Sequence, residues 1–301
     1  MKICRRRREE TLTSPPETEQ SESRHLVSYS GLTLHKPPII HSLTRAELKD
    51  LELAKSLLEN PGFTIRIANL LGSPVEKGFA LLPSGWSNKV NQAAKTALLK
   101  ALRLAVASLG SRRPRKSREF LHKVLIGTSG GIGGAFGLAA LPVELPVSTA
   151  IMLRSIADIA RSEGHNISLM KTRLECLEVF ALGSRSTSDN AADSAYWITR
   201  AALTKTVSDA AVYLTQKGSV DATAPVIIRL INAIASRFGV MVSEEIAAKA
   251  VPVIGAAGGG LINVLFIDHF QDMARGHFIV KRLEALHGVE IVKSIYEEIE
   301  V

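Results

Sequence analysis

The chain has 301 residues, and its 37 Lys and Arg against 29 Asp and Glu give a formal net charge of +8. Hydrophobic residues make up 46% of the chain, which excludes a wholly disordered protein. The two cysteines, Cys4 and Cys176, exclude a disulfide scaffold and a multi-cysteine zinc module. We therefore expect a globular body with a sizeable core.

Residues 1–40 are predicted to be a disordered tail ahead of a helical domain over residues 41–301. The tail contains a run of four arginines, Arg5 to Arg8, followed by polar and acidic residues with little apolar surface to bury. A signal peptide needs an apolar segment after its charged start, and none follows here. We therefore expect a cytoplasmic protein, associated with the inner face of the cell membrane. Binding of nucleic acid by the basic tail is a weaker hypothesis.

The pattern of apolar residues predicts an all-α protein with one large helical domain. Thr44 and Glu47 have the spacing of a capping box, and Ser243 is expected to cap a further helix. Runs of alternating β-branched residues are missing, which argues against a sheet. Helices or short apolar segments are expected near residues 44–59, 64–72, 74–82, 87–108, 147–161, 168–182, 194–217, 224–238, from 243 onward, 276–287 and 289–299.

Two glycine-rich segments, 124–143 and 250–267, carry no charge and are predicted to be central helices. As a helix the first would be about 30 Å long, roughly the thickness of a hydrocarbon core. Small residues four apart allow close helix packing. This spacing occurs among Gly127, Gly130, Gly131, Gly133, Gly134 and Gly137, and again between Gly255 and Gly259. Two interpretations stay open: insertion into a membrane, or a helical hairpin buried in a soluble core.

The glycines do not fit a nucleotide site. A P-loop needs Lys and Ser or Thr after its last glycine, and no such pair follows. Gly131 and Gly133 begin a dinucleotide-binding pattern, but Phe136 stands where its third glycine belongs. No cofactor is therefore expected.

A basic loop precedes the first glycine-rich segment and is a candidate contact for anionic headgroups, with each cation contributing about 1 kcal/mol. Its charged residues are Arg112, Arg113, Arg115, Lys116 and Arg118.

Polar residues beside the apolar segments are further candidates. Arg154, Asp158 and Arg161 have helical spacing on one face, which fits either an ion-pair ladder or a cleft in which Arg154 or Arg161 binds an anionic headgroup. A buried polar cluster is proposed from Glu144, Asp158, Glu178, Asp268, His269, Asp272 and His277. Several of these are carboxylates and imidazoles, so a soluble metal-binding protein or a hydrolase is the alternative, although no metal site is predicted. Cys176 is expected to be buried as a small apolar residue.

Several long strings resemble the EcsC family of bacterial proteins. They include Gly137 to Thr149, Met152 to Arg161, Arg173 to Gly183 and Val251 to Gly258. Residues from Asn263 to Gln271 and from Ala274 to Phe278 complete a resemblance over roughly residues 75 to 295. The resemblance implies a helical, membrane-associated protein and carries over no catalytic residues.

Together these observations predict a non-enzymatic protein that binds an anionic membrane surface, a lipid, or a membrane-protein partner of a transport or secretion system. The oligomeric state stays open.

Overall fold

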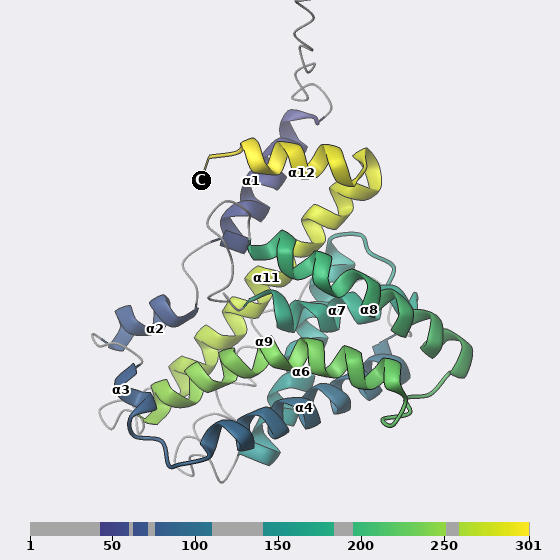
Figure 1. Cartoon of the computed structure of the whole chain (residues 1–301). Coiled ribbons are helices and arrows are strands. Elements are labelled where there is room, and N and C mark those ends of the chain that lie inside the picture. The colour runs from purple at the N-terminus through teal and green to yellow at the C-terminus, as the bar shows by residue number, and fades with distance from the viewer. Residues whose placement is uncertain are drawn as a thin grey trace, which may run out of the picture. The chain divides into compact units, whose positions relative to one another are not determined.

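The computed structural model describes residues 43–59, 63–71, 76–109, 141–183, 195–250 and 259–300. Within these ranges the chain is all-α, as predicted, and contains no strand. The described helices are α1 (Arg45–Glu59), α2 (Phe63–Leu71), α3 (Glu76–Phe79), α4 (Trp86–Ser108), α6 (Leu141–Ser162), α7 (Met170–Leu182), α8 (Ala195–Lys217), α9 (Pro225–Ala250), α11 (Gly259–His287) and α12 (Val289–Glu298) (Figure 1). All of them belong to one compact unit, Pro38–Val301.

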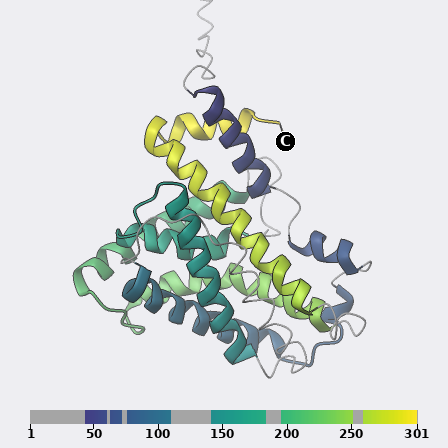
Figure 2. The ribbon, with the colours of Figure 1, turned by 180° about the vertical axis from the view of Figure 1, so that it is seen from behind.

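The core is centred on α11, which packs against α1, α6, α7, α9 and α12. Seen from behind, α6 and α11 run side by side (Figure 2). Phe180 of α7 meets Phe238 of α9 and Phe270 of α11, with ring centroids 5.0 and 5.2 Å apart, respectively. All three rings are fully buried, so this cluster joins three helices that are far apart in sequence.

The start of α1 confirms the predicted capping box. The Thr44 backbone N–H donates to Glu47 Oε2 at 2.8 Å, and the Glu47 backbone N–H donates to Thr44 Oγ1 at 3.3 Å. These reciprocal bonds satisfy two N–H groups that the helix itself leaves without partners. The bond from the Thr44 backbone, together with those from His287 and the Thr44 hydroxyl, lowers the pKa of Glu47 to about 2.

Two glycines outside the predicted pairs allow helices to approach closely. At Gly276 of α11, an added Cβ would lie 2.6 Å from Leu58 Cγ and 2.9 Å from the Ala54 carbonyl oxygen, both on α1. Gly78 of α3 lies against the backbone of Ala247 on α9 in the same way. Of the predicted packing glycines, Gly259 is buried at the start of α11, and the others lie outside the described residues.

The expected break before Ser243 is wrong. Residues 225–250 form the single helix α9, and the Ser243 hydroxyl donates to the Gly239 carbonyl oxygen at 2.6 Å instead of capping a new helix. Phe238, Met241 and Val242 are buried before Ser243, and Ala247 and Ala248 are buried after it. Their burial keeps the chain helical where the local sequence favours a helix start.

Two other boundaries differ from the expectation. The helix expected from residue 147 begins at Leu141, so Pro142 and Pro146 lie in its first two turns, where few intrahelical bonds are lost. The helix expected at 276–287 is the second half of α11, whose first half includes residues 259–267 of the second glycine-rich segment. Gly288, with φ of 89°, separates α11 from α12 as predicted.

Candidate functional site

Helix α4 presents a cationic face. Its buried side consists mainly of alanine and leucine, while Lys89, Lys95, Lys100 and Arg103 are all exposed. The helix contains no Asp or Glu, and none of these four cations forms an ion pair with a described residue. The helix therefore carries four positive charges that no acidic residue of the same helix neutralises. We call these four side chains the α4 cations.

A groove runs between α4 and α6. It is open to solvent, has a volume of about 440 Å³ and is lined mainly by apolar residues, with Lys100 of α4 and Arg154 of α6 as its two charged lining residues among those that the structure describes. Val143 is 72% exposed and Val147 is 50% exposed. With Ile151 these valines form a stripe at intervals of four residues, which places them on one face of α6. We call this cavity the α4–α6 groove.

Arg161 lies beyond the end of this groove and has structural partners. Its guanidinium donates to Asp158 Oδ1 at 2.6 Å and to the Leu109 carbonyl oxygen at 2.8 Å. The second bond satisfies a carbonyl at the C-terminal end of α4 and aligns that end with the C-terminal part of α6. The guanidinium of Arg161 therefore has a structural role in joining α4 to α6.

Arg154 differs from Arg161, although both were predicted as anion contacts. Its side chain is exposed and has no ion pair among the described residues. It shares a small cavity of about 60 Å³ with Asp158 and Arg161, which confirms that the three residues lie on one helix face. Because Arg161 neutralises Asp158, Arg154 is the accessible cation of this group.

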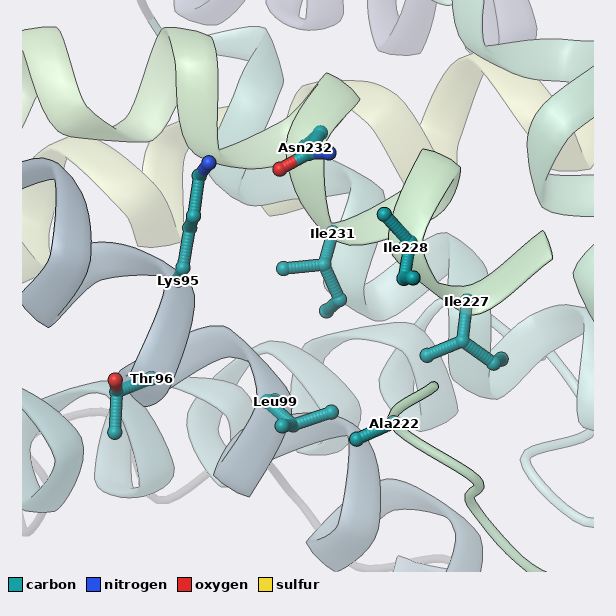
Figure 3. A pocket seen from close by; sticks show the side chains of 8 residues that line it. All are labelled: Lys95, Thr96, Leu99, Ala222, Ile227, Ile228, Ile231 and Asn232. Atoms are coloured by element: carbon teal, nitrogen blue, oxygen red, sulfur yellow. The ribbon is translucent and has the colours of Figure 1, made fainter. Parts of the chain in front are cut away.

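A second, smaller groove of about 240 Å³ lies on the other flank of α4, against the start of α9. In Figure 3, Ile227 and Ile231 of α9 face Leu99 of α4, and Lys95 stands at the edge. Two of the α4 cations, Lys95 and Lys100, thus each line a mainly apolar groove.

Glu144 pairs across helices with Lys249 at the end of α9, with the Oε1 to Nζ distance at 3.3 Å. Lys249 also pairs with Glu245 at 2.8 Å. This group ties α6 to α9, and among the described residues it forms no hydrogen bond or ion pair with the other members of the predicted polar cluster.

The residues of the predicted polar cluster that lie on α11 form hydrogen bonds or ion pairs with different partners. His269 is buried, and burial lowers its pKa to about 4; its neutral ring donates from Nε2 to the Gly183 carbonyl oxygen at 3.0 Å. Asp272 instead pairs with Arg66 of α2 at 3.0 Å, and Asp268 is half-buried. Within the described ranges, no three His, Cys, Asp or Glu residues are placed to hold a metal ion. The predicted cluster therefore does not assemble as a metal site there.

His277 lies in a buried network between α8 and α11, and the buried Glu178 of α7 interacts electrostatically with Arg200 of that network. Tyr196 of α8 lies with its hydroxyl 3.2 Å from His277 Nδ1, and Arg200 forms two hydrogen bonds with Glu284. Burial lowers the pKa of His277 well below its usual range and raises the pKa of Glu178 to about 7. Sequence spacing could not bring these residues together, because they come from three helices.

Cys176 is buried, as predicted, and burial raises the pKa of its thiol, which makes it unreactive. The predicted basic loop, Arg112 to Arg118, lies outside the described residues, as does most of the first glycine-rich segment. Sequence reasoning missed the α4 cations, although the absence of acidic residues from 86 to 108 was a visible signal.

Among the described helices, α9 alone is long and apolar enough to cross a membrane. Half of its most apolar window is buried inside the protein, and core helices of soluble proteins meet the same criterion. This helix is not one of the two glycine-rich segments singled out from the sequence.

Fold and surface together define an all-α protein with a central buried helix and a cationic helix set between two apolar grooves. The chain belongs to the EcsC protein family, whose family model matches residues 46–283. The resemblance seen in the sequence is thereby confirmed. Comparisons with curated proteins and with solved structures found no match.

Proposed function

We propose that this protein binds anionic membrane surfaces from the cytoplasmic side through the α4 cations. The observation that carries the proposal is a helix with four exposed cations and no acidic residue. A cation near an anionic bilayer contributes about 1 kcal/mol, so the four together would contribute about 4 kcal/mol.

The apolar surroundings of α4 support the same proposal. Val143 and Val147 on one flank and Ile228 on the other are exposed aliphatic side chains. Cations beside exposed aliphatic residues are typical of surfaces that lie in the interface of a bilayer. A membrane-protein partner is compatible with this placement, but no described contact favours one.

The test is flotation of the full chain with vesicles of phosphatidylcholine alone and with 30% phosphatidylglycerol. Replacing all the α4 cations with Gln should abolish flotation with the anionic vesicles, whereas wild type should float with them and not with the neutral ones. Binding by wild type should also weaken as salt is raised from 50 to 500 mM, because ions screen exposed charges.

A matched control removes four positive charges elsewhere on the described surface. Its substitutions to Gln are at Arg45, Lys49, Lys171 and Lys217, which are exposed and form no ion pair with a described residue. This control should float as wild type does, because its cations are not on α4. Equal loss in both variants, or no loss in the α4 variant, would overturn the proposal. A third variant with Gln at Arg112, Arg113, Arg115, Lys116 and Arg118 measures the separate share of the predicted basic loop.

A further inference from the structure

We propose that the α4–α6 groove binds the acyl chain of a single anionic lipid, with the headgroup at Arg154. The proposed function concerns a charged membrane surface, whereas this inference concerns a single lipid molecule. It rests on the proposed function only in taking the membrane as the source of that lipid.

The size and lining of the groove fit an alkyl chain. A volume of about 440 Å³ lies in the usual range of ligand pockets, which is about 300–1,000 Å³. The stripe from Val143 to Ile151 runs about 12 Å along α6, at about 1.5 Å per residue. Pro142 and Pro146 add apolar surface beside it. A stripe of aliphatic side chains that follows one helix favours an extended chain over a compact ring.

The two charged residues that line the groove, Lys100 and Arg154, favour an anionic ligand. Arg154 lies three residues beyond Ile151, at the end of the stripe, and Lys100 faces the groove from α4. A guanidinium can bind a carboxylate or a phosphate through two parallel hydrogen bonds. Asp158 does not oppose this, because its carboxylate is already paired with Arg161 at 2.6 Å.

A second copy of this chain fits the groove less well. A two-fold symmetric contact would bring the same patch of both copies together. Lys100 and Arg154 of one copy would then face the same cations of the other, which is unfavourable. An anionic amphiphile instead complements both the apolar stripe and its charged end.

The experiment uses monomeric ligands without a bilayer. A fluorescent palmitic acid is titrated into the full chain below its aggregation concentration, and unlabelled palmitic acid and hexadecanol are used as competitors. We expect saturable binding at one site per chain, displaced by the acid far better than by the alcohol.

Substitutions at two exposed residues test the charged part and the apolar part of the site separately, and we expect both variants to keep the native fold. Arg154→Gln removes the charge, and Val147→Gln places an amide in the apolar stripe. Each should weaken binding about tenfold or more. Arg229→Gln is the matched control, because this exposed arginine of α9 does not line the groove, and it should bind as wild type does.

The inference is overturned if wild type does not bind the acid. It is also overturned if Arg154→Gln and Val147→Gln bind as tightly as the control, or if the alcohol competes equally. If the fatty-acid assay fails but wild type still floats with anionic vesicles, the proposed membrane binding is unaffected. Flotation of the α4 variant tests the proposed membrane binding, and probe binding by Arg154→Gln tests the groove. The two proposals can therefore fail independently.

Discussion

Glu178 offers the sharpest test of how burial affects titration in this core, since the residue is 4% exposed and its Oε1 has no hydrogen-bond partner among the described residues. Burial raises its pKa from an ordinary 4.5 to about 7, against the lowering effects of Lys281 and Arg200. One pKa unit corresponds to about 1.4 kcal/mol, so ionised Glu178 costs the folded state about 3 kcal/mol.

The sign of the pH dependence follows from proton binding. Between pH 4.5 and 7 the folded protein holds a proton on Glu178 that the unfolded chain releases, so stability falls as pH rises and levels off above 7. Glu178→Gln removes this loss. The free energy of unfolding of the variant relative to wild type should therefore rise by about 2 to 3 kcal/mol between pH 5 and pH 8.

Urea unfolding of both proteins at several pH values measures this difference, and near-UV circular dichroism checks the native fold. Glu175→Gln is the matched control on the same helix. The Glu175 carboxylate pairs with Lys281 at 2.8 Å, so its loss should destabilise the protein at pH 8 by about 3–5 kcal/mol. A difference between Glu178→Gln and wild type that stays constant with pH would refute the reasoning.

The remaining predictions concern helix contacts and are checked by thermal or urea unfolding. Gly276→Ala should destabilise by about 1–3 kcal/mol, because the new methyl group meets the backbone of α1; unchanged stability would mean that α1 can shift freely. Arg200→Ala should cost about 3–5 kcal/mol by leaving Glu284 buried and unpaired, and replacing both residues with Leu should restore part of the loss. Thr44→Ala should cost about 1 kcal/mol through loss of the cap, and a change within error would show that α1 does not depend on it.

Features that depend on neighbouring residues were predictable from the sequence. The Thr44–Glu47 capping box and the separation of α11 from α12 at Gly288 involve contacts within one turn or one junction. The shared face of Arg154, Asp158 and Arg161 follows from helical spacing alone. The break before Ser243 was the main error in the helices, since buried residues on both sides hold α9 together.

The partners of the polar residues were not predictable. Arg161 bonds to the Leu109 carbonyl oxygen 52 residues away, and this contact decides that Arg161 is structural while Arg154 stays accessible. His269 and Asp272 are three residues apart, yet one meets Gly183 and the other Arg66. Residues that seemed to form one cluster in the sequence therefore belong to different helix contacts.

The sequence by itself determined the all-α class, the family and the positions of most described helices, because helix periodicity and caps are local. The tertiary structure alone decided which helices meet, where the α4–α6 groove opens and which charges are neutralised. Those outcomes depend on close packing between segments that are distant in sequence, and no local pattern specifies such a contact. At Gly276, for example, the lack of a side chain lets α1 pack closely against α11.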